Sequence, residues 1–123
     1  MDAVTSQRAE DVTVPTLVLR ALSRCATQFA KAQDMPRRTH VDKVARSERL
    51  AALCDRESRW YGVLHRWAYS THGTVPLVFG QAAVRAESCA MTDARFWADD
   101  AAYYRARLAG LDHDQAEIGA WST

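Results

Sequence analysis

Residues 49–67, RLAALCDRESRWYGVLHRW, place apolar and basic side chains on two adjoining faces of a single expected helix. At about 100° per residue, the apolar side chains of this stretch and one alanine just beyond it fall on one broad stripe. Its members are Leu50, Leu53, Cys54, Trp60, Tyr61, Leu64 and Ala68. We therefore expect its aromatic residues to be core residues first. Glu57 lies inside the same stripe, and its carboxylate needs a partner there, such as an arginine of a neighbouring helix or a tyrosine hydroxyl.

Helix boundary signals flank this stretch and the segment before it. Thr13 and Pro15 have the residue types of a helix cap and a first turn, and Pro36 removes a backbone donor after a run of apolar residues at helical spacing. We therefore expect a first helix from Thr13 to a point before Pro36. A second helix is expected over about residues 41–70, closed by Gly73.

The rest of the chain repeats these signals. A threonine and a proline again open a segment, which predicts a third helix over about residues 74–90. Thr92 is expected to cap a fourth helix, and Asp112 to cap a short last helix that ends near Trp121. The expected fold is all-α, a four-helix bundle with a short additional C-terminal helix. Its parts are a polar N-terminal leader, the helical bundle, and a short C-terminal helix or tail, at residues 1–12, 13–111 and 112–123.

Composition narrows the class of protein. Of the 123 residues, 48% are hydrophobic and 25% are charged, which is typical of a soluble globular domain. No apolar run approaches the ~20 residues that span a bilayer, and the N-terminus lacks the pattern of a signal peptide. The cysteines Cys25, Cys54 and Cys89 are odd in number and lie in apolar-periodic segments, so we expect reduced core thiols in a cytoplasmic protein.

Charge is distributed unevenly along the chain. The net charge is +1 for the whole sequence, but it is −2 over residues 1–14, +7 over residues 15–85 and −4 over residues 86–123. A basic middle between acidic ends suits a nucleic-acid partner, an acidic protein partner, or copies of the chain associating head to tail.

Seven cations of the basic middle form two stripes at helical spacing. The stripe of the second helix contains Arg49, Arg56, Arg59 and Arg66, and that of the first helix contains Arg20, Arg24 and Lys31. Two basic stripes in one bundle predict a groove that follows the phosphates of a single strand. The alternative is a solvated face whose arginines pair with Asp55, Glu48 and the acidic fourth helix.

Two arginine–histidine pairs have a catalytic interpretation. Arg59 with His65, and Arg66 with His72, have the spacing of the motif in HEPN-type ribonucleases, which the chain resembles in this respect. The resemblance implies a metal-independent cut, with histidine as acid–base and arginine steadying the phosphate. Of the two pairs, Arg66 and His72 are the better placed for this alternative, because they straddle the expected helix end. We expect no cofactor and no metal site.

The chain has a further likeness to a known family, which rests on two stripes: RALSRCATQFAK, residues 20–31, and RLAALCDRESRWYGVLHRW, residues 49–67. In size, helix content and charge layout it resembles the small helical subunit of CRISPR effector complexes. That resemblance implies a non-enzymatic subunit of a nucleoprotein complex, which holds a strand by its backbone beside other subunits. The sequence contains no helix-turn-helix or zinc-finger spacing, so we do not expect the protein to read bases.

The competing hypothesis is a protein-binding inhibitor or adaptor of mobile-element type. Whether the strand is DNA or RNA stays open.

Overall fold

The computed structural model describes residues 13–70 and 75–121, and the side chains of this part as far as Leu111. Within it the chain forms three helices and no strand: α2 (Val14–Gln33), α3 (His40–Ser70) and α4 (Leu77–Trp121). The all-α prediction is confirmed. Not one of these helices carries an apolar stretch long enough to span a lipid bilayer. The predicted leader and the predicted helix end at Gly73 lie outside the described residues.

The boundaries of α2 and α3 agree with their sequence signals. The carbonyl oxygen of Thr13 accepts the backbone N–H of Leu17 at 3.1 Å, and α2 ends before Pro36. At the start of α3 the hydroxyl of Thr39 accepts the N–H of Asp42 at 3.0 Å, and the Asp42 carboxylate accepts the N–H of Thr39 at 3.4 Å. Each residue thus satisfies a backbone donor of the other, which defines the start of the helix.

The predicted third, fourth and C-terminal helices are one continuous helix of 45 residues, so the prediction of a four-helix bundle is wrong. Thr92 does not cap a helix: its hydroxyl donates to the carbonyl oxygen of Ser88, one turn earlier, at 3.0 Å. This bond lets a threonine sit inside a helix without a free polar group. Asp112 also lies within α4. Residues 81–109 contain neither proline nor glycine, so nothing there interrupts the helical backbone.

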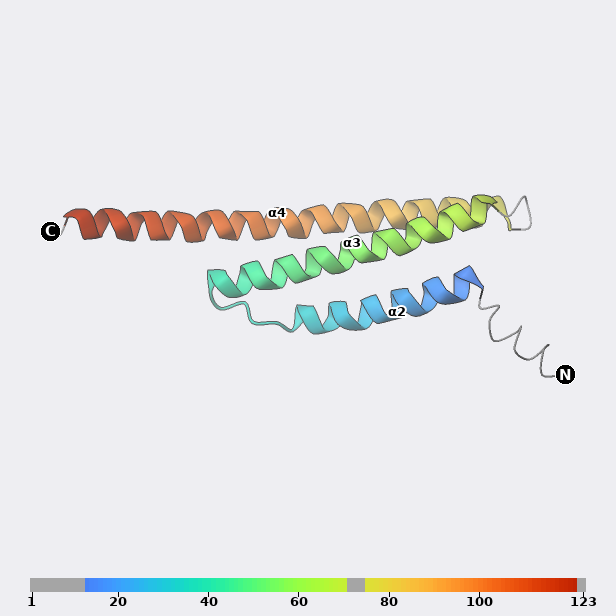
Figure 1. Ribbon diagram of the computed structural model, residues 1–123, viewed down its shortest axis with the longest axis horizontal. Helices are drawn as coiled ribbons and strands as arrows, with labels where there is room; N and C mark the ends of the chain where they lie inside the picture. The colour runs from blue at the N-terminus through green and yellow to red at the C-terminus, as the bar shows by residue number, and fades with distance from the viewer. Residues whose placement is uncertain (1–12, 71–74, 122–123) are drawn as a thin grey trace.

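Helix α3 lies between the other two helices (Figure 1). Both α2 and α4 pack on α3, whereas no Cα atom of α2 comes within 8 Å of one in α4. The core where α2 meets α3 contains the buried residues Ala32, Leu50 and Leu53, and Phe29, Met35 and Trp97 pack against it. The predicted apolar stripe is thus confirmed at its most buried positions.

The far end of α4 extends past the start of α3 (Figure 1). At ~1.5 Å per residue, α4 is ~68 Å long and α3 is ~46 Å long. His40, the first residue of α3, lies against Tyr104, with ring centroids 5.7 Å apart. The part of α4 after Leu111 therefore has no stretch of α3 beside it.

Polar contacts tie α3 to α4 at both ends of their shared length. The hydroxyl of Ser47, which is buried, donates to the Asp100 carboxylate at 2.6 Å. Arg105 of α4 forms an ion pair with Glu48. Nearer the other end, Nδ1 of His65 lies 2.6 Å from Oε2 of Glu87. These contacts set the register of the antiparallel pair.

Gly62 of α3 lies against the side chain of Glu87 in α4, and its replacement by leucine is expected to destabilise the fold by about 1–3 kcal/mol. A Cβ atom at this position would lie 3.2 Å from Oε2 of Glu87 and 3.3 Å from Nη1 of Arg66, so leucine must displace these side chains and disturb the contact of Glu87 with His65. Urea unfolding followed by circular dichroism measures the loss. The matched control is Gly110→Leu, because a Cβ at Gly110 meets no atom within 4 Å. A similar loss in both variants would contradict the packing argument.

Candidate nucleic-acid interface

Three of the seven predicted cations lie where α2 meets α3, and two more continue their line along α2. Lys31 of α2 and Arg49 of α3 line one pocket of about 160 Å³. About two turns further along α3, Nη1 of Arg56 donates to the side-chain oxygen of Gln28 in α2 at 3.2 Å. Arg20 and Arg24 continue the line along α2, because at 100° per residue each lies about 20° from Lys31 around the helix axis. We call these residues the basic strip: Arg20, Arg24, Lys31, Arg49 and Arg56.

The charges of the basic strip have no ionic partner among the described residues. All five residues are exposed, and none of them forms an ion pair there. The two carboxylates that the solvated-face alternative invokes on α3 are paired elsewhere: Asp55 with Arg59, and Glu48 with Arg105. Within the described part of the chain, that alternative accounts for Arg59 but not for the strip.

Arg59 and Arg66 are not brought together with the strip. Nη2 of Arg59 lies 2.8 Å from Oδ2 of Asp55, and its side chain is 79% exposed. Arg66 approaches α4, since the Cβ position at Gly62 is 3.3 Å from its Nη1 and 3.2 Å from Oε2 of Glu87. The contact of Arg59 and Arg66 with a strand stays a prediction. The other five cations form the basic strip.

The arginine–histidine pair of α3 does not converge on one point. Arg59 is held by Asp55, while Nδ1 of His65 is held by Glu87 on the α4 side at 2.6 Å. The ring of His65 also meets Tyr69 edge-on, with centroids 6.2 Å apart. The geometry of the other pair, Arg66 and His72, is not described, because His72 lies outside the described residues. The ribonuclease alternative therefore gains no geometric support from Arg59 and His65.

A second group of cations, which sequence reasoning missed, lies in the first two turns of α3. The guanidinium carbon of Arg46 is 5.4 Å from the centre of the Trp97 ring, and Nζ of Lys43 is 5.1 Å from that of Tyr104. Arg46 also donates from Nε to the carbonyl oxygen of Gln33, at 3.3 Å, where α2 ends. The i, i+3 spacing of these two cations was the available signal.

The carboxylate of Glu57 does not find the partner expected for it. Among the described residues it makes no hydrogen bond or ion pair, and its electrostatic neighbours are Asp93, Cys54 and Tyr61. Burial raises the pKa of Glu57, and the charge of Asp93 raises it further. Burial likewise raises the pKa of Tyr61, with a second contribution from Glu57.

The three cysteines are free, as expected, but only two are in the core. Cys25 and Cys54 are buried, whereas Cys89 is exposed on α4, so the prediction of three core thiols is wrong for Cys89. Burial, then the charges of Asp93 and Glu57, raise the pKa of Cys54 to about 11. The Cys54 thiol is therefore protonated near neutral pH and is a poor nucleophile.

We expect Glu57→Gln to raise the unfolding midpoint near pH 7 and to leave it unchanged near pH 3.5. The raised pKa means that folded Glu57 holds its proton more tightly than the unfolded chain does. The contribution of Glu57 to the free energy of unfolding therefore falls as the pH rises above its ordinary pKa of 4.5. Glutamine carries no charge at any of these pH values, so the variant does not lose stability in this way. Thermal unfolding across this pH range measures the effect. Asp99→Asn, which removes an exposed charge from α4, is the control, and equal gains in both variants would contradict the argument.

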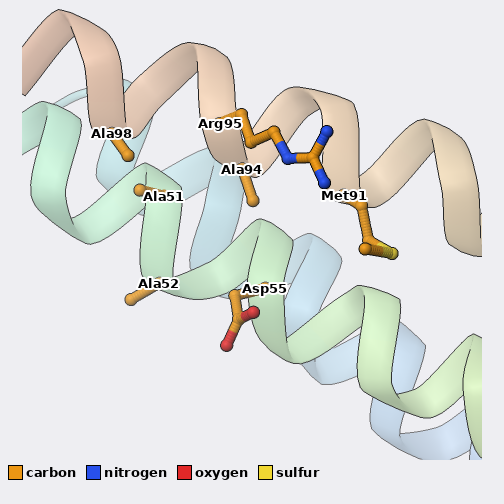
Figure 2. A pocket seen from close by; sticks show the side chains of 7 residues that line it. All are labelled: Ala51, Ala52, Asp55, Met91, Ala94, Arg95 and Ala98. Carbon is orange, nitrogen blue, oxygen red and sulfur yellow. The ribbon is translucent and has the colours of Figure 1, made fainter.

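An apolar groove of about 400 Å³ lies on the face where α3 meets α4. Figure 2 shows Ala51 of α3 and Ala94 and Ala98 of α4 along the line where the two helices meet, with Met91 at one end. Asp55 and Arg95 bring charges to its rim. Small side chains leave room for a further helix, so this surface suits protein contact rather than phosphate contact.

No family model matches this chain, and no curated protein or solved structure matches it either.

Proposed function

We propose that the chain is a non-enzymatic helical subunit of a nucleoprotein complex, which contacts the backbone of a single strand through the basic strip. The observation that carries the proposal is a line of five exposed cations without ionic partners in the described residues. Such cations bind phosphates by releasing the counterions that surround a nucleic acid.

The dimensions of the basic strip fit a strand. From Arg20 to Lys31 the stripe on α2 is ~16 Å long, at ~1.5 Å per residue, which is the length of several nucleotides. Arginine and lysine contacts to phosphate position a strand without reading its bases. The strip itself contains no aromatic side chain on which a base would stack.

Other subunits belong to the proposal, because the acidic end of one copy, with a charge of −4 over residues 86–123, complements the basic middle of another, with +7 over residues 15–85. The alanine-lined groove between α3 and α4 is a surface on which a neighbour would dock. The neighbours include copies of the chain arranged head to tail, in a cytoplasmic ribonucleoprotein or DNA complex.

The proposal is tested by fluorescence anisotropy of labelled single-stranded DNA and RNA with the purified protein, from about 50 to 200 mM salt. Each neutralised phosphate contributes about 0.7 to the slope of log affinity against log salt for a single strand, so five cations predict a slope of at most about −3.5. Binding that weakens steeply with salt supports the strip. A failure to bind either strand at the lowest salt overturns autonomous strand binding. Shortening of the RNA would instead favour the ribonuclease alternative.

The groove favours one second candidate, a protein-binding adaptor of mobile-element type. An adaptor would use the apolar groove for a helix of its target and would show no affinity for either strand. Replacing Ala94 and Ala98 with glutamate would abolish target binding by an adaptor, whereas strand binding through the basic strip would persist.

A further inference from the structure

A pocket of about 220 Å³ lies between the turn that joins α2 to α3 and the middle of α4. It is lined by Arg37, Lys43, Arg46, Ser47, Asp100 and Tyr104. These residues come from three separate segments of the chain, so the pocket exists only in the folded protein.

Two of the three cations of the pocket, Lys43 and Arg46, are held in place before any ligand arrives. Arg46 lies over the ring of Trp97 and is anchored through Nε to the carbonyl oxygen of Gln33. Lys43 lies over the ring of Tyr104 at 5.1 Å. A cation fixed over an aromatic ring loses little freedom when it binds an anion, which strengthens binding.

The charge of the lining fits one class of anion. Three cations face one carboxylate, Asp100, so the lining carries a net charge of +2. Asp100 is itself engaged, because its Oδ2 accepts the hydroxyl of Ser47 at 2.6 Å. None of the three cations forms an ion pair with a described residue. A phosphate monoester carries a charge of about −1.5 to −2 at neutral pH, which matches the lining, whereas a phosphodiester carries only one negative charge.

The aromatic rings at the pocket do not offer a stacking surface for a base. Tyr104 has Lys43 over its ring and His40 stacked against it, with ring centroids 5.7 Å apart. Arg46 covers Trp97 in the same way. The ligand is therefore recognised by its phosphate group and not by a base.

The pocket also continues the basic strip. Arg46 precedes Arg49 by one helical turn, and Arg49 lines the neighbouring pocket with Lys31. We propose that this pocket binds the terminal phosphate monoester of a nucleic-acid strand whose backbone follows the basic strip. The inference rests on the proposed function for the strand, while the phosphate chemistry rests on the pocket alone.

The first test compares three strands of one sequence that end in a 5′-phosphate, a 3′-phosphate or hydroxyls only, each labelled at an internal position. We expect one phosphorylated strand to bind the protein about 5- to 10-fold more tightly than the hydroxyl strand, because a second negative charge meets preplaced cations. Arg37→Gln should remove this advantage. Arg38→Gln is the matched control, since Arg38 is the adjacent residue, is also exposed, and does not line the pocket.

A second test needs no strand. Inorganic phosphate and a nucleoside 5′-monophosphate should each raise the unfolding midpoint of the protein and of Arg38→Gln, at constant ionic strength set by chloride, but not that of Arg37→Gln. Circular dichroism checks that both variants are folded. If this difference holds while no strand binds, the pocket stands as a phosphate site and the proposed function falls.

Two results would overturn the inference. One is equal affinity for phosphorylated and hydroxyl strands together with no phosphate-dependent difference between Arg37→Gln and Arg38→Gln. The other is a phosphate advantage that persists in Arg37→Gln, which would place the terminal phosphate elsewhere on the chain. Salt-dependent strand binding alongside either result would leave the basic strip supported and the pocket refuted.

Discussion

A triple variant with glutamine at Arg24, Lys31 and Arg56 is expected to bind a single strand about 100-fold more weakly than the unchanged protein at about 50 mM salt. Each of these cations is exposed and lacks an ionic partner in the described part of the chain, so each is available to a phosphate. Losing three phosphate contacts should also reduce the salt slope by about 2. Anisotropy titrations at several salt concentrations give both numbers.

The matched control also removes three positive charges, but away from the strip, with glutamine at Arg85, Arg95 and Arg107. All three residues are exposed on α4. We expect this control to keep most of the affinity and most of the salt slope. Equal losses in the two triple variants would show that strand binding follows net charge and not the basic strip, which would contradict the proposed interface.

The second large effect concerns stability. Leu50→Ala is expected to lower the free energy of unfolding by about 2–5 kcal/mol, out of the 5–15 kcal/mol typical of a domain. Leu50 is fully buried in the cluster with Ala32 and Leu53, where α2 meets α3. Its truncation removes apolar contacts and leaves a cavity between rigid helices.

Urea unfolding followed by circular dichroism and tryptophan fluorescence measures this loss. Leu19→Ala is the control, because Leu19 is 65% exposed on α2 and its truncation should change stability by less than about 0.5 kcal/mol. A loss below 1 kcal/mol for Leu50→Ala would mean that this cluster is not the main core. Because α2 is packed through this cluster, the variant should also weaken strand binding by separating the two halves of the basic strip.

The helices α2 and α3 were predictable because their signals are local. The apolar periodicity that places Leu50, Leu53 and Cys54 on one face depends only on 100° steps along one helix, and the same is true of the stripe from Arg20 to Lys31. Pro15 and Pro36 act within one turn of the chain, so they marked the limits of α2 correctly, whereas Thr13 stands at the cap position without a capping hydrogen bond from its side chain.

The limits of local signals appear in α4. Thr92 and Asp112 have the residue types of helix caps, but the same side chains are accepted inside a helix, as the bond from Thr92 to Ser88 shows. Packing of α4 along α3 stabilises the continuous helix, and local cap propensity is too weak to break it. The predicted bundle of four helices failed for that reason.

By itself the sequence determined the all-α class, the faces of α2 and α3, and the excess of positive charge in the middle of the chain, because these depend on residue type and helical spacing. Only the tertiary structure decided which cations lie together. It separated Arg56, beside α2, from Arg59, which pairs with Asp55. It also brought Arg46 to the ring of Trp97, 51 positions later in the chain. Contacts of that kind depend on where two helices cross, and the crossing is set by the packing of whole faces rather than by any short stretch of residues.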